Sequence, residues 1–124
     1  MKLNSHFLSG VVFGALLTGG LSYYLQSASA AGSSEAKVLL ENDRVRVRQV
    51  LFQPGVRPGP HTHTYAHVGV ILDEGSLAFA EKGQKDETVN FKSGDAGWRD
   101  ANVTHEVFNA GKKPIRVVEV ELKK

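Results

Sequence analysis

Residues 55–75 read GVRPGPHTHTYAHVGVILDEG. A loop rich in Gly and Pro leads into an alternating His-Thr-His, and a run rich in β-branched residues follows. Because successive side chains of a strand point to opposite faces, His61 and His63 are expected to project to the same side. Two imidazoles at this spacing can reach one metal ion, and a third nitrogen ligand would have to come from a distant strand. His105 is the candidate for that ligand.

The rest of the chain, from residue 37 on, predicts short strands separated by turns. Runs of β-branched and aromatic residues alternate with clusters of Gly, Pro, Asn and Asp, and no window in this region predicts a helix of three turns. So many short strands in a small chain predict an all-β fold, a sandwich or a barrel closed on itself. The expected strands are residues 45–49, 66–72, 77–81, 88–91, 96–99, 105–108 and 115–122.

The composition excludes several classes of protein. A chain of 124 residues is expected to form one domain rather than two. It has 15 Lys and Arg against 13 Asp and Glu, a net charge of +2, so we expect no nucleic-acid partner. Cysteine is absent, which excludes disulfides and thiolate ligands. Any metal must therefore be held by His, Asp, Glu or backbone groups.

Residues 1–30 carry the pattern of a secretory signal peptide. Lys2 precedes an apolar run over residues 7–21, and Ala28-Ser29-Ala30 offers a small-residue cleavage site. The alternative is an uncleaved anchor, because residues 7–25 nearly reach the ~20 residues that span a bilayer. Only if this segment stays uncleaved is the membrane an expected partner of the chain.

Cleavage after Ala30 predicts a periplasmic or secreted protein. Residues 31–36 are small and polar without periodicity, which indicates a flexible tether. Residues 37–124 are then expected to form the barrel domain.

The spacing of glycines and histidines resembles the two motifs of the cupin superfamily, G-x5-H-x-H-x3–4-E-x6-G and G-x5-P-x-G-x2-H-x3-N. In this chain the motifs read Gly55-x5-His61-x-His63 ending at Gly75, and Gly94-x5-Asp100-x-Asn102-x2-His105-x3-Asn109. The resemblance implies a small, jelly-roll-like cupin barrel over residues 41–122, with a divalent metal on His61, His63 and His105. Asn102 replaces a turn glycine, and we expect it to adopt the left-handed conformation that Asn tolerates.

The glutamate of the first motif is missing. A count of three residues after His63 places His67 at that position and predicts a four-histidine site. A count of four places Val68 at the glutamate position, and His67 would then point to the opposite face of the strand, away from the other histidines. The sequence leaves both registers open. It also leaves the metal open, because imidazole ligands suit Fe, Mn, Ni, Cu and Zn.

The cupin resemblance implies a metal-dependent enzyme of the oxygenase type, acting on a small organic acid. One alternative is a non-catalytic module that binds a metal or a small ligand, and another is a barrel with vestigial histidines. A narrower resemblance is to small bacterial cupins, some linked to β-alanine degradation. It is carried by residues 41–47, by Phe52-x-Pro54-Gly55 and by His61-x-His63-x-Tyr65.

Expected partners are a small-molecule ligand and a second copy of the chain, because cupins often pair.

Two further features have structural interpretations. Arg44, Arg46 and Arg48 occupy alternate positions and predict the solvated or ion-pairing face of a strand rather than a ligand patch. Trp98 lies in a predicted strand and is expected in the barrel core.

Overall fold

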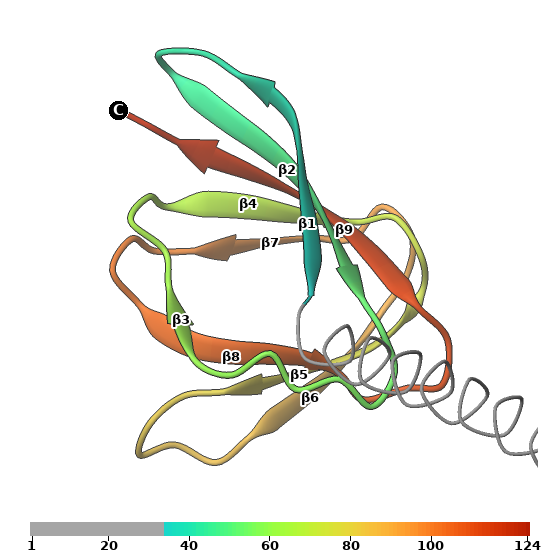
Figure 1. Ribbon diagram of the computed structural model, residues 1–124. Helices are drawn as coiled ribbons and strands as arrows, with labels where there is room; N and C mark the ends of the chain where they lie inside the picture. The colour runs from blue at the N-terminus through green and yellow to red at the C-terminus, as the bar shows by residue number, and fades with distance from the viewer. Residues whose placement is uncertain (1–33) are drawn as a thin grey trace, which may run out of the picture. The chain divides into compact units, whose positions relative to one another are not determined.

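Two antiparallel sheets lie face to face in the computed structural model, which describes residues 34–124 (Figure 1). The first sheet has the strand order β1-β2-β9-β4-β7, and the second has the order β3-β8-β5-β6. The strands are β1 Glu35–Glu41, β2 Val45–Phe52, β3 His61–Thr62, β4 His67–Ile71, β5 Gly75–Ala80, β6 Glu87–Phe91, β7 Ala96–Arg99, β8 Thr104–Asn109 and β9 Ile115–Leu122. Within residues 34–124, no helix is long and apolar enough to cross a membrane.

The expected all-β fold is confirmed for the described residues, and each expected strand is present with small shifts at its ends. β1 was not expected. It begins at Glu35, so the predicted tether of residues 31–36 is wrong at its end, where two residues already pair with β2. The predicted signal peptide, residues 1–30, and the cleavage site after Ala30 lie outside the described residues.

The hydrophobic core fills one end of the space between the sheets. Its buried side chains come from both sheets and are Val50, Phe52, Ile71, Leu77, Val107, Ile115 and Val117. The expectation that Trp98 lies in the core is wrong, because Trp98 pairs with Val68 on the outer side of the sheet and is 55% exposed. Toward the other end the same inner surface becomes polar. In β9, Ile115 and Val117 are followed at the same face by Glu119 and Glu121, and all four are buried. A buried carboxylate costs free energy unless it is paired, so Glu119 and Glu121 require charged or hydrogen-bonding partners at this end of the barrel.

Three asparagines fix connections between the strands. Asn42 Oδ1 accepts backbone N–H groups two and three residues further on, at 2.8 and 2.9 Å, and forms the turn between β1 and β2. The Asn109 amide donates to the backbone carbonyls of Phe52 and Lys113. Asn102 has a φ of 64°, so the expected left-handed conformation is confirmed.

Gly75→Ala is expected to destabilise the barrel. A Cβ at residue 75 would lie 2.6 Å from Cδ1 of Ile115, and Ile115 is only 1% exposed, so its packed neighbours keep it in place. We expect the free energy of unfolding to fall by about 1–3 kcal/mol, measured by thermal or urea denaturation. In the control Gly97→Ala, a Cβ meets nothing within 4 Å, and the stability should be unchanged. Equal losses in both variants would contradict this packing argument.

Candidate metal centre

Four histidines meet inside the polar end of the barrel. His61 comes from β3, His63 from the segment after it, His67 from β4 and His105 from β8. Ring centroids are 4.8 Å apart for His61 and His63, 4.8 Å for His61 and His105, and 4.2 Å for His63 and His67. His61 is exposed, whereas the other three are buried. The structure thus brings together all four histidines that the sequence analysis named.

Strand pairing explains how residues so distant in sequence converge. His61 lies directly opposite His105 in the antiparallel β3–β8 pair. His67 lies opposite Glu121 of β9 and Arg99 of β7, and it faces the barrel interior with them. Its neighbour Val68 therefore points outward. The structure therefore agrees with the motif alignment that has three residues between His63 and the glutamate position. In this alignment His67 occupies the position of the motif's glutamate.

The nitrogen atoms of the cluster have the spacing of ligands to one ion. Nε2 of His61 lies 2.9 Å from Nε2 of His63. Two nitrogens bound to one ion at about 2.1 Å and at right angles are ~3 Å apart. His61, His63 and His105 offer ligand atoms that all lie within 4.8 Å of one another. These three residues fit a divalent metal.

Both ring nitrogens of His105 are buried without a hydrogen-bond partner. Burial, followed by the charges of His61 and Arg99, lowers the pKa of His105 to about 3, so the ring is neutral and keeps a free lone pair. Nδ1 of His67 is also buried and unpaired, and burial lowers the pKa of this ring as well. A buried polar atom without a partner costs free energy, which a bound metal ion would recover at these lone pairs.

A second set of ligand atoms adjoins the first. His63, His67 and Glu119 are all buried and offer atoms within 4.8 Å of one another. Glu119 comes from β9 and was not among the expected ligands. It brings a carboxylate to a site that was expected to contain histidines alone. Since His63 belongs to both sets, the two sets form one continuous cluster.

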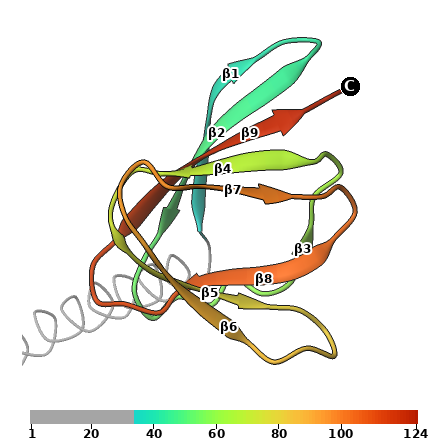
Figure 2. The same cartoon turned by 180° about the vertical axis from the view of Figure 1, so that it is seen from behind.

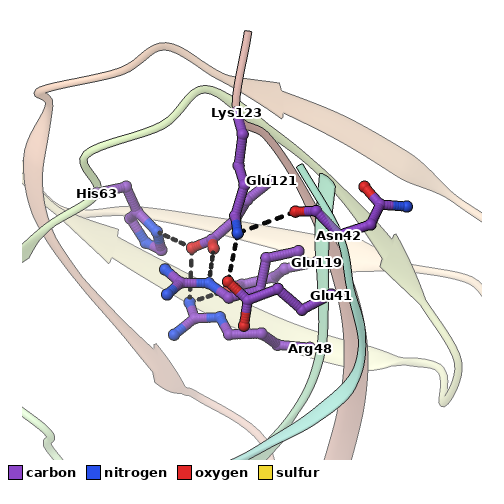
Figure 3. Close-up of polar contacts among 8 residues, drawn as sticks. Glu41, Asn42, Arg48, His63, Glu119, Glu121 and Lys123 are labelled. Atoms are coloured by element: carbon purple, nitrogen blue, oxygen red, sulfur yellow. Dashed lines mark hydrogen bonds and ion pairs between the residues drawn. The ribbon is translucent and has the colours of Figure 1, made fainter. Parts of the chain in front are cut away.

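Two arginines of β2 neutralise the buried glutamates of β9. Arg46 Nε donates a hydrogen bond to Glu121, whose side chain is 2% exposed. Arg48 Nη2 lies 3.3 Å from Oε1 of the same carboxylate (Figure 3). Arg48 Nη2 also donates to Glu119 Oε2 at 2.5 Å. Burial alone would raise the pKa of Glu121, but the Arg46 hydrogen bond and both arginine charges outweigh burial and hold it below its usual value. Of the three arginines of the predicted face, Arg46 and Arg48 form ion pairs on the inner side of the sheet, whereas Arg44 precedes β2 and is exposed.

Glu121 also reaches the histidines. Its Oε1 lies 3.5 Å from Nδ1 of His63 (Figure 3). The other ring nitrogen of His63, Nε2, is the one that lies 2.9 Å from Nε2 of His61. A carboxylate on one ring nitrogen fixes the orientation of a ligating histidine and makes the other nitrogen a better ligand. Glu121 is therefore a positioning residue for His63.

Glu119 and Glu121 were not among the expected site residues, although the sequence carries a signal for them. Their alternation with Val118 and Val120 places them on the same face as Ile115. Two carboxylates that continue an apolar strand face indicate a polar interior.

An apolar chamber of about 240 Å³ adjoins the cluster, with His67 and His105 in its wall. Arg99 also lines it and is held by Glu81 at 2.9 Å. Most of the wall is apolar and is formed by Phe52, Ile71, Leu77, Phe79, Val89, Phe91, Val107 and Val117. The apolar part of a small ligand can lie here, next to the histidine rings.

The family model of the cupin domain matches residues 48–121, which include both sets of ligand atoms. The chain belongs to the cupin superfamily. This membership agrees with the strand order, with the position of the histidines and with the motif spacing in the sequence.

This cupin is 35% identical over 86 residues to the β-alanine degradation protein BauB of Pseudomonas aeruginosa, covering 69% of this chain and 90% of BauB. It is 28% identical to a cupin domain protein of Bordetella pertussis, with a TM-score of 0.69 over 75% of this chain and 96% of that one. The polyketide cyclase RemF of Streptomyces resistomycificus is 18% identical, with a TM-score of 0.59 over 72% of this chain and 64% of RemF. At that identity the likeness shows the fold alone.

Glu121→Gln is expected to weaken metal binding by about 10–100-fold. The amide carries no charge, so Nδ1–H of His63 loses its anionic acceptor while every histidine remains. Titration calorimetry with Zn²⁺ measures the affinity. The control Glu41→Gln removes a carboxylate that pairs with Lys123 and contacts no histidine. The positioning role is contradicted if Glu121→Gln binds Zn²⁺ as tightly as the wild type.

Proposed function

We propose that this cupin binds a divalent metal ion through His61, His63 and His105, with His67 beside the ion, and acts on a small organic acid. The observation that carries the proposal is His105, a buried neutral ring with two unpaired nitrogens. It lies beside two histidines whose Nε2 atoms are 2.9 Å apart. Iron, manganese, nickel, copper and zinc all suit these ligands.

The cluster is accessible from two sides. His61 is exposed, which leaves a route to solvent, and His105 and His67 border the apolar chamber. Three protein ligands leave coordination positions for a substrate, as in metalloenzymes with open sites. The metal, when bound, supplies a Lewis acid or redox centre at these positions. The protein's residues hold the ion, orient His63 and offer a largely apolar wall to a ligand in the chamber.

The charges of the site support an acidic substrate. Arg46 and Arg48 carry the charge that balances Glu119 and Glu121, so a divalent ion on neutral histidines keeps its own positive charge. An acid whose carboxylate reaches the ion and whose apolar part enters the chamber matches both features. The name of BauB ties that relative to the degradation of β-alanine, which supports a small acid as the substrate class. With the signal pattern of residues 1–30, we place this activity in the periplasm or outside the cell.

A second candidate function is a non-catalytic module that holds a metal or a small ligand. It is favoured by the fully buried set of His63, His67 and Glu119, since additional protein ligands would occupy the positions that a substrate needs. The two functions therefore differ in which residues the metal requires.

Metal content separates these candidates. Protein from cells expressing the full chain, purified without a metal-binding tag, is expected to hold near one equivalent of metal by elemental analysis. His105→Ala and His61→Ala should lose it, while the control Thr62→Ala on the same strand keeps it. Glu119→Gln should retain metal under the enzyme proposal and lose it in the alternative. Unchanged metal in His105→Ala, or none in the wild type even after reconstitution, would contradict the shared site.

Occupation of the chamber by a ligand can be tested separately from the metal. Val89→Trp is expected to fill the chamber from β6 and to weaken the binding of benzoate, a compact apolar acid, at least tenfold by titration calorimetry. Its metal content should not change. Thr88→Trp places the same side chain on the exposed, opposite side of β6 and is the matched control. Equal benzoate affinity in the two variants would exclude the chamber as the ligand site.

A further inference from the structure

The segment between β2 and β3, residues 53–60, carries His61 into the metal centre. It runs along β8 in both views of the barrel (Figures 1 and 2). β3 itself holds His61 weakly, because it is an edge strand of two residues that pairs with β8 alone. Strands in globular proteins are usually longer. The position of His61 therefore depends in part on the contacts of the preceding segment.

One carboxylate, that of Glu106 in β8, receives three hydrogen bonds from this segment. Arg57 Nε donates to Oε1 at 3.0 Å, and Arg57 Nη2 donates to Oε2 at 2.6 Å. The backbone N–H of Gly59 donates to Oε1 at 3.1 Å. Two-pronged contacts between Arg and a carboxylate are among the stronger and more directional hydrogen bonds in proteins. We call Arg57, Gly59 and Glu106 the latch.

The latch lies on the outer side of β8. Side chains of a strand alternate, so Glu106 and Phe108 point away from the interior that His105 and Val107 line. Glu106 is nevertheless only 8% exposed, since the segment lies over its carboxylate. The guanidinium of Arg57 stacks on the ring of Phe108, with Cζ 3.7 Å from the ring centroid. Charge, hydrogen bonds and a stacked cation thus dock the segment on β8.

The latch ends two residues before His61. Gly59 lies between Pro58 and Pro60, which have no N–H and a restricted φ. Gly59 itself has a φ of 87°, a left-handed value that glycine tolerates. Because Pro60 stiffens the link, a fixed Gly59 limits where the backbone of His61 can lie. Ligands of a metal site must be held to within about 0.5 Å, and His61 is the exposed one of the four histidines.

We propose that the latch positions His61 for the metal ion. Glu106 follows His105 directly in β8, and Gly59 lies two residues before His61, so the latch joins the backbones that carry two of the expected ligands. Glu106 and Arg57 act through His61 and are positioning residues rather than ligands. The role in metal binding rests on the proposed function, whereas the hold on His61 exists without a metal. Opening of the latch frees His61 and leaves the ion on the remaining histidines.

Glu106→Gln keeps the size of the side chain and removes the charge with which Arg57 pairs. The affinity for Zn²⁺, measured by titration calorimetry on the purified full chain, is expected to fall about tenfold or more, because His61 is no longer held. Arg57→Ala removes the other half of the pair and should have the same effect. We call these two the latch variants.

Asp73→Asn is the matched control. Arg116 binds the Asp73 carboxylate in the same two-pronged way, at 2.7 and 2.8 Å. This pair lies between β4 and β5, beyond the far end of β4 from His67. The control should therefore bind Zn²⁺ with wild-type affinity. A loss of affinity that follows only from weaker folding would appear in the control as well.

Nitrogen NMR of the histidine rings separates positioning from a general loss of stability. In the Zn²⁺-loaded wild type, His61, His63 and His105 should each show one ring nitrogen bound to the metal. In Glu106→Gln the signal of His61 should return to that of a free imidazole, while the other two rings stay bound. In the metal-free protein, hydrogen exchange of residues 59–63 should be about tenfold faster or more in the latch variants and unchanged in the control.

Zn²⁺ affinity that stays at the wild-type value in both latch variants overturns the proposal. So does a loss of affinity in which His61 remains bound or which the control shares. If the wild type binds no Zn²⁺ at the histidines, the proposed function fails, and hydrogen exchange alone decides the latch: faster exchange of residues 59–63 in the latch variants supports it, and unchanged exchange overturns it. If Glu106→Gln does not fold by circular dichroism, Arg57→Ala carries each measurement, because the Arg57 side chain is 55% exposed.

Discussion

Two carboxylates buried inside a small β-barrel must be neutralised where they lie, and the rest of the site depends on how this is done. Taking one charge out of water costs several kcal/mol. β2 pairs with β9 residue by residue, so that Arg46 lies opposite Glu121 and Arg48 opposite Glu119. A slip of one residue would turn both arginines to the outside and leave the glutamates without partners. Charge pairing thus favours this register of the two strands, together with the apolar core.

The same register orders the histidines. β4 pairs with the opposite edge of β9, which places His67 beside Glu121 on the inner surface. The carboxylates therefore have arginines on one side and imidazoles on the other. Because the arginines keep Glu121 ionised, it can hold Nδ1 of His63 while Nε2 faces His61. The short strand β3 then completes the cluster by pairing His61 with His105. Charged and imidazole side chains therefore line one end of the barrel interior, and the polar site of this small chain lies there.

The sequence predicted the strands and the convergence of the histidines, because a period of two and the motif spacing carry that information. It could not decide which strand face lies inside. Alternation of Arg and Val in β2 has the same period in either orientation, so the sequence left a solvated and an ion-pairing arginine face open. The usual assumption that apolar side chains lie inside and polar ones meet water placed Trp98 in the core. That assumption fails where the interior itself is polar. The orientation of His67 depends on pairing with β9, a contact between distant residues that no local pattern records.

The most direct test of a metal on His61, His63 and His105 is anomalous diffraction from crystals of the protein loaded with Mn²⁺ or Ni²⁺. Data are collected on both sides of the metal's absorption edge. We expect one anomalous peak at about 2.0–2.3 Å from Nε2 of His61, Nε2 of His63 and a ring nitrogen of His105. A peak held by His67 and Glu119 without His105, or no peak at the cluster, would contradict it.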